Sequence, residues 1–165
     1  MPTRRAAALA ASDDVDAVTD AVLTASRLLV AVSARSIAAV DESITIPQFR
    51  LLVVLHTRGP LKLSGLAESL GVNPSTATRM VDRLVAAELV SRQANPASRR
   101  ELVVSLTGSG EAVVREVTQR RRKEIARIVG RMAVTTRRGL VRALNAFAEA
   151  GDEPGIADQG DALWL

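Results

Sequence analysis

The most regular hydrophobic pattern in the chain lies between Leu63 and Leu106. Apolar residues recur at steps of three and four on either side of Gly71, and apolar and polar residues alternate after Val90. Steps of three and four keep side chains on one face of a helix, whereas alternation is typical of a strand with one buried face. The pattern therefore predicts two short helices followed by a hairpin of two short strands.

The segment around Gly71 predicts a steep crossing between the two helices. Helices joined by a turn of three or four residues leave room only for small groups where they cross, and Ala67 supplies such a group. Gly71 can adopt a positive φ, and Asn73-Pro74 suits a helix start because Asn caps free N–H groups and Pro fits the first helical position. The second helix then buries one stripe, which consists of Ala77, Met80, Val81 and Leu84.

The opposite face of the second helix is polar. Hydroxyl and guanidinium groups near a helix N-terminus suit the bases and phosphates of the DNA major groove. The alternative is a helical hairpin of the core whose polar face is merely solvated. The residues expected on this face are Ser75, Thr76, Thr78, Arg79, Asp82 and Arg83.

The hairpin that follows favours DNA binding. We expect strands at 90–94 and 101–106, with a turn at Asn95-Pro96. Arg99 and Arg100 follow Ser98, so two cations lie at or near the tip, where they can reach the minor groove or the DNA backbone. In the second strand, one face is expected to carry Leu102, Val104 and Leu106. The pattern as a whole predicts a winged helix-turn-helix.

Long amphipathic segments flank this unit. Upstream, apolar residues repeat at steps of three and four from Val15 to Val32, and a break at 41–45 precedes a helix expected from Ile46 to about His56. Downstream, Thr107 is the expected N-cap of a long helix, and another helix is expected over 132–150. The fold class is therefore mainly α with a small β-wing.

The flanking helices present more apolar surface than one winged unit can cover. We call the second helix of the winged unit, which carries the polar face, the reading helix. A homodimer would bury the apolar surface of the flanking helices. It would also present two reading helices to successive major grooves, about 34 Å apart, on palindromic double-stranded DNA. The alternative is a monomer whose terminal helices pack on each other.

Charge is unevenly distributed. All 22 Lys and Arg residues precede residue 151, whereas four of the 18 Asp and Glu residues follow it, so residues 1–150 carry a net charge of +8. This excess favours a polyanionic partner through counterion release, although it also aids solubility. The run Arg120–Lys123 could contact phosphates, but a charge run on a helix is more often a solvated face.

Composition argues against several other classes. With no Cys and one His, the chain has no disulfide or thiolate chemistry and little to offer a metal, so we expect no metal or cofactor. Ser64 and Ser75 lack a suitably spaced base and carboxylate, and no Gly-rich phosphate loop is present, so we expect no enzyme. No apolar run approaches the roughly 20 residues that span a membrane, and the Ala-rich start is too weakly hydrophobic for a signal peptide. We expect a soluble, cytoplasmic protein without a membrane partner.

The sequence resembles the MarR family of bacterial regulators over roughly residues 12–150. The motif begins at Ile46-Pro47-Gln48-Phe49-Arg50-x-Leu52, ahead of Gly59-Pro60. It continues as Leu66-Ala67-x-x-Leu70-Gly71-Val72-x-Pro74-Ser75-Thr76-x-Thr78-Arg79-x-Val81-Asp82-Arg83-Leu84. It ends with Glu88-Leu89-Val90-x-Arg92, Arg99-Arg100 and Leu106-Thr107-x-x-Gly110.

The resemblance implies an obligate dimer that acts as a repressor, less often an activator, and that leaves its operator when a small, often aromatic, ligand binds between the dimer helices and the reading domain. It implies Arg100 as the minor-groove arginine, although Ser98 replaces the usual wing Asp. Phe49 and His56 are candidate effector contacts, but a lone His there is more often a satisfied core or surface residue. The implied DNA-binding set is Ser75, Thr76, Thr78, Arg79, Arg83, Arg99 and Arg100.

These observations predict five segments. We expect a disordered N-terminus at 1–11, a dimerisation helix at 12–45, a winged helix-turn-helix at 46–106, C-terminal dimerisation helices at 107–150 and an acidic tail at 151–165. The leading hypothesis is a homodimeric, sequence-specific transcriptional repressor with a small effector. The alternative is an architectural protein that coats DNA with little sequence preference; the hydroxyl-rich reading helix argues against it because coating needs only cations.

Overall fold

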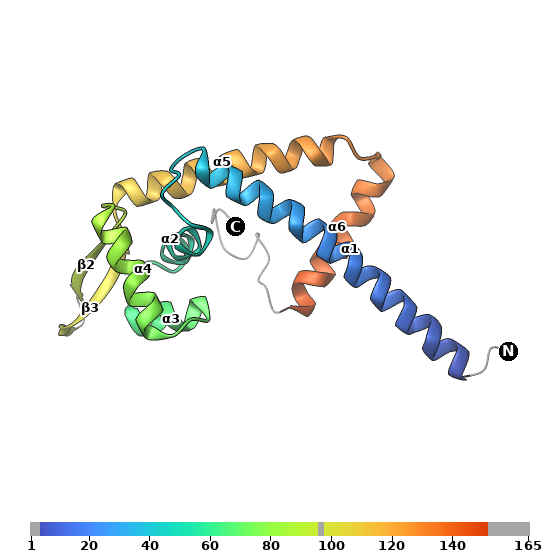
Figure 1. Ribbon diagram of the computed structural model, residues 1–165, viewed down its shortest axis with the longest axis horizontal. Coiled ribbons are helices and arrows are strands. Elements are labelled where there is room, and N and C mark those ends of the chain that lie inside the picture. The colour runs from blue at the N-terminus through green and yellow to red at the C-terminus, as the bar shows by residue number, and fades with distance from the viewer. Residues whose placement is uncertain (1–3, 96–97, 152–165) are drawn as a thin grey trace.

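The fold consists of two long helices that extend from a small winged unit (Figure 1). The computed structural model describes residues 4–95 and 98–151, and their side chains within 14–94 and 102–151. Its helices are α1 (Arg4–Ala38), α2 (Ile46–Arg58), α3 (Leu63–Leu70), α4 (Pro74–Ala86), α5 (Gly108–Gly130) and α6 (Val134–Ala150). Its strands are β1 (Leu61–Lys62), β2 (Val90–Asn95) and β3 (Ser98–Leu106).

The winged unit occupies one end of the molecule. Helices α2, α3 and α4 lie beside the hairpin β2–β3, while α1 and α5 run side by side away from it and α6 turns back after α5 (Figure 1). The C-terminal half of α1 packs on α5, but its N-terminal half extends past the rest of the chain. The prediction of a mainly α protein with a small β-wing is confirmed.

Local capping explains where the central helices begin. Thr45 and Gln48 form a capping box at α2, in which each side chain accepts a hydrogen bond from the other residue's backbone N–H. Thr107 caps α5, because its hydroxyl accepts from the Gly110 N–H at 3.0 Å. Gly71 ends α3 in the left-handed region at φ 65°, as expected for a turn that L-residues rarely adopt. These caps fix the reading unit between α2 and α5.

The sheet has three strands in the order β1-β3-β2, all antiparallel. Strand β1 was not predicted, because two residues are too few to show alternation. It pairs with β3 at Leu61 opposite Val104, so β3 is the central strand and both Val103 and Val104 are buried. Leu102, expected on the buried face with Val104 and half-buried Leu106, is instead 61% exposed because it lies beyond the core.

One hydrophobic core joins the winged unit to the long helices. Phe49, which is 1% exposed, lies at its centre on α2. Leu66 of α3, Val81 of α4 and Val114 of α5 are fully buried in the same cluster. Because α4 and α5 both contribute buried residues to this core, the position of α4 is linked to that of the long helix through the shared core.

Several predicted boundaries need correction. Residues 4–11, expected to be disordered, belong to α1, since a run of Ala has the highest helix propensity. The first helix ends at Ala38, α2 continues to Arg58, and α6 begins at Val134. Strand β2 ends at Asn95 and β3 begins at Ser98, so both wing strands are longer than predicted. Residues 1–3 and most of the predicted acidic tail lie outside the described residues.

The expectation that no apolar run is long enough to span a membrane is also wrong, because one helix meets the criteria of length and composition for a membrane span. Within the helical segment Asp14–Ala38, which has 25 residues, a window of 18 residues reaches a mean hydropathy of 1.5, so the segment is long and apolar enough to cross a membrane. Its last 18 residues contain only two charged side chains, Arg27 and Arg35. A helix whose apolar surface is covered by another protein chain has the same composition, so this finding does not establish a membrane span.

Candidate nucleic-acid interface

The start of α4 is fixed by its own side chains. The Asn73 carboxamide oxygen accepts from the Thr76 N–H at 2.8 Å, and Pro74 occupies the first turn. The Ser75 hydroxyl donates to the same Asn73 oxygen at 2.8 Å. The cap fixes the position of the α4 N-terminus. The remaining free N–H groups and the positive end of the helix dipole point out of the fold there.

The two faces of α4 differ as predicted. Ala77, Val81 and Leu84 are buried, and Met80 is half-buried. Ser75, Arg79 and Arg83 are exposed, whereas Thr76 and Thr78 are half-buried; the Thr78 hydroxyl donates to the Pro74 carbonyl at 2.8 Å. The structure thus brings all five predicted α4 residues together on one helix, and both arginines among them are exposed.

An ion pair that sequence reasoning missed joins α4 to the wing. The Arg92 guanidinium on β2 donates to the Asp82 carboxylate on α4. Both side chains are substantially exposed, so the direct contribution to stability is small, about 0–1 kcal/mol. The main effect of the ion pair is to hold the wing in position against the reading helix. Asp82 was predicted as one of the free polar residues, and only the sign of its charge hinted at a cationic partner.

The basic residues predicted for the wing lie at the start of its second strand. Ser98, Arg99 and Arg100 begin β3, and Ser98 is paired with Asn95 across a register shift next to the turn. The side chains of these four residues lie outside the described part, so the roles expected for Arg99 and Arg100 remain predictions. Closer to the core, the Ser91 and Ser105 hydroxyls lie 3.1 Å apart across the two strands.

The base of the wing is tied to the start of α5. Thr107 donates its hydroxyl to the Glu88 carbonyl at 2.7 Å and its N–H to the Leu89 carbonyl at 3.1 Å. Glu88 has a φ of 59°, which strains a residue with a β-carbon. The α4–β2 turn is therefore held in place by the residue that also caps α5.

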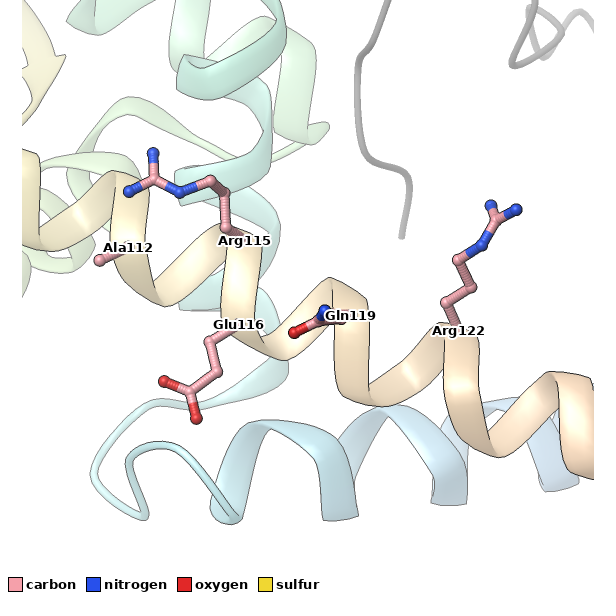
Figure 2. Close-up of a pocket in the computed structure, with 5 residues that line it drawn as sticks. All are labelled: Ala112, Arg115, Glu116, Gln119 and Arg122. Atoms are coloured by element: carbon pink, nitrogen blue, oxygen red, sulfur yellow. The ribbon is translucent and has the colours of Figure 1, made fainter.

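The roles expected for Phe49 and His56 as effector contacts remain predictions. Phe49 is enclosed in the core, and half-buried His56 lies on α2. A cavity of about 490 Å³ is lined by Ala112, Arg115, Glu116, Gln119 and Arg122, and neither candidate lines it. Figure 2 shows that all five residues project from one stretch of α5, so they form a polar surface hollow on one helix.

The Arg120–Lys123 run is not uniformly solvated. Arg120, Arg122 and Lys123 are exposed, but Arg121 is half-buried, and its Nε and Nη1 atoms are buried without a hydrogen-bond partner in the described structure. Burial lowers the pKa of Arg121 below its usual value because desolvation penalises the charged guanidinium. The expectation of a solvated face is therefore wrong at this one residue.

No group of three or more His, Asp or Glu side chains that could hold a metal occurs among the residues described. The donors around α4 and the wing are guanidinium, hydroxyl and backbone N–H groups. These groups suit anionic oxygens and base edges.

Comparison with known proteins places this geometry in a family context. The sequence profile of the MarR family matches residues 44–102. The crystal structure of RV1404 from Mycobacterium tuberculosis is 64% identical, with a match that covers 86% of this chain and 97% of that chain at a TM-score of 0.79. The transcriptional repressor MdtR of Bacillus subtilis is 37% identical over 52% of this chain and 56% of its own length.

A more distant structure shows the same fold. A mutant of MarR from E. coli, crystallised with operator DNA, is 21% identical, with 82% of this chain and 96% of that chain covered at a TM-score of 0.62. The first three curated relatives are matched over 66%, 46% and 56% of their own lengths. The chain thus spans about half to two thirds of these relatives.

Proposed function

The chain belongs to the MarR family, whose members are DNA-binding transcriptional regulators and not enzymes, and we propose that it binds operator DNA as a homodimer. The observation that carries the proposal is the capped start of α4, where five polar residues share one helix beside a wing. In this proposal α4 enters the major groove, and the wing contacts the adjacent minor groove or backbone. The residues that would make these contacts are Ser75, Thr76, Thr78, Arg79, Arg83, Arg99 and Arg100.

The apolar surface outside the winged unit supports the dimer. No residue of α6 is buried, yet this helix presents Val134, Val141, Leu144 and Phe147 to solvent. Helix α1 likewise exposes Val15, Val18, Leu23, Leu28, Leu29 and Val30. Contiguous apolar surface on this scale marks an interaction site. We assign it to a second copy, so that α1, α5 and α6 form the dimerisation segments around residues 46–106.

The sense of regulation is proposed from relatives. MdtR of Bacillus subtilis and NicR of Pseudomonas putida, 37% identical over part of the chain, are named as repressors. We propose repression in the cytoplasm, with release by a small, often aromatic, effector. The architectural alternative keeps DNA binding but requires no sequence preference; the short hydroxyl side chains of α4 disfavour it, because they add little to phosphate binding.

The test is selection of bound fragments from the protein's own genome, followed by titration of the selected duplex and of a scrambled duplex at equal salt. We expect a palindrome with half-sites one helical turn apart and at least about a thousandfold tighter binding to it. Equal affinity for both duplexes would support the architectural alternative and overturn the proposal.

Substitutions separate the two DNA contacts. Arg100→Ala is expected to weaken binding to every duplex and to lower the slope of log affinity against log salt by about one. Arg79→Ala is expected to change which half-site bases are preferred, if its guanidinium reads a base edge. An unchanged salt slope for Arg100→Ala would remove the wing from the proposed interface.

A further inference from the structure

We propose that a small, polyvalent oxyanion of the phosphate class binds between the C-terminal end of α1 and the middle of α5. The site is a cavity of about 220 Å³, separate from α4 and the wing. Its lining residues come from two helices and are Arg35, Ser36, Ala39, Arg120, Lys123, Glu124 and Arg127. Binding at this site does not require that the proposed DNA binding be correct.

The cavity is cationic on both walls. Four basic side chains line it against a single acid, Glu124, and that acid is already paired with Arg35 across the two helices. Arg120 pairs with Glu116 at 2.9 Å along α5. Within the described residues, Lys123 and Arg127 have no hydrogen-bond or ion-pair partner. The cavity therefore has a surplus of positive charge from residues on one face of α5.

This arrangement is unfavourable without an anion. Arg120, Lys123 and Arg127 are three and four residues apart, so they project from the same face of α5. Like charges at this spacing repel each other and destabilise the helix. An anion with several oxygens would relieve the repulsion and could accept hydrogen bonds from more than one of these groups.

A buried hydroxyl supplies a second, independent indication. Ser36 lines the cavity and is only 3% exposed, and its Oγ is buried without a hydrogen-bond partner among the described residues. Buried hydroxyl groups nearly always have a hydrogen-bond partner, because burying a polar group without one carries a desolvation penalty. An oxyanion in the cavity would offer an acceptor beside the cations.

Size and chemistry narrow the ligand class. Sites for drug-sized molecules enclose about 300–1,000 Å³ and are mostly apolar. This cavity is smaller, and of its lining residues only Ala39 is apolar. It fits a phosphate or diphosphate group better than an aromatic effector. The phosphate could belong to a free small molecule or to a DNA backbone, and we assign it to a free small molecule because the cavity lies between α1 and α5 and no residue of the reading helix lines it.

The experiment measures binding of inorganic phosphate and pyrophosphate to the full chain by calorimetry and by thermal shift, against chloride at equal ionic strength. Lys123→Gln combined with Arg127→Gln is the test variant, and Arg138→Gln combined with Arg142→Gln is the control. The control pair is also four residues apart and removes the same charge from exposed positions outside the cavity. We expect pyrophosphate to bind at least tenfold more weakly to the test variant and unchanged to the control.

Three results would overturn the proposal. The first is equal binding by the test variant and the unmodified chain, and the second is an equal loss in the control. The third is loss of duplex DNA affinity in the test variant with no phosphate binding by the unmodified chain, which would assign these cations to the DNA backbone. If the double variant does not fold, Ser36→Ala, which removes only the hydroxyl, must weaken pyrophosphate binding severalfold. The first two results involve no DNA, so failure of the genomic DNA selection would leave them unaffected.

Discussion

Gly110 packs directly against the carbonyl oxygen of Leu89. A β-carbon on Gly110 would lie 2.1 Å from that oxygen and 3.0 Å from Leu106 Cδ2. The same carbonyl accepts the Thr107 N–H, so it cannot move away without losing a hydrogen bond at the base of the wing. The close approach of α5 to Leu89, the residue just before β2, therefore depends on the absence of a side chain at position 110.

Gly110→Ala is expected to lower the free energy of unfolding by about 1–3 kcal/mol through overpacking against backbone. Chemical denaturation monitored by circular dichroism measures the change. Gly108→Ala is the matched control, because a β-carbon there meets nothing within 4 Å at the start of the same helix. Equal effects of the two substitutions would contradict the close-packing argument.

The strained turn residue Glu88 gives a prediction of opposite sign. Its φ of 59° costs an L-residue about 1–2 kcal/mol, part of which is offset in Gly by the greater freedom of the unfolded chain. Glu88→Gly is expected to raise the free energy of unfolding by up to about 1 kcal/mol in the same assay. The neighbouring Ala87→Gly, at a φ of −85°, is expected to lower it. A loss of stability in both variants would show that Glu88 is not strained.

The Asp82–Arg92 ion pair is expected to affect DNA binding more than folding. A double-mutant cycle with Asp82→Asn and Arg92→Gln measures this on the selected duplex and by denaturation. Because the pair is exposed, the coupling energy for folding should stay below about 1 kcal/mol. Coupling for DNA affinity should exceed it, because the pair holds the wing. Additive effects on affinity would mean that each residue acts independently.

The proposed dimer face on α6 can be tested by adding a charge. Phe147→Glu places a carboxylate on an apolar side chain that is 57% exposed in the single chain. We expect the dimer to dissociate into monomers at concentrations where the unmodified chain remains dimeric, as measured by analytical ultracentrifugation. Thr135→Glu adds the same charge to the same helix at an exposed polar position that is not three or four residues from any of its exposed apolar residues, and should leave the dimer intact. A dimeric Phe147→Glu protein would remove this face from the interface.

The local parts of this fold could be predicted from the sequence, because they depend on nearby residues. Asn73 and Thr107 cap helices whose first turns lie next to them, and the stripe from Ala77 to Leu84 follows from helical spacing. Contacts between distant segments could not be predicted in this way. The Asp82–Arg92 pair depends on how β2 lies against α4, and the burial of Arg121 depends on how α5 packs within the folded chain.

Strand β3 ends at Leu106 and helix α5 begins at Gly108, so Thr107 alone separates the hairpin from a helix of 23 residues, about 35 Å long. Such a junction behaves mechanically as a stiff lever with a short arm, the hairpin, and a long arm, the helix. A small rotation of α5 therefore rotates the hairpin by the same angle, because no flexible loop separates the two elements.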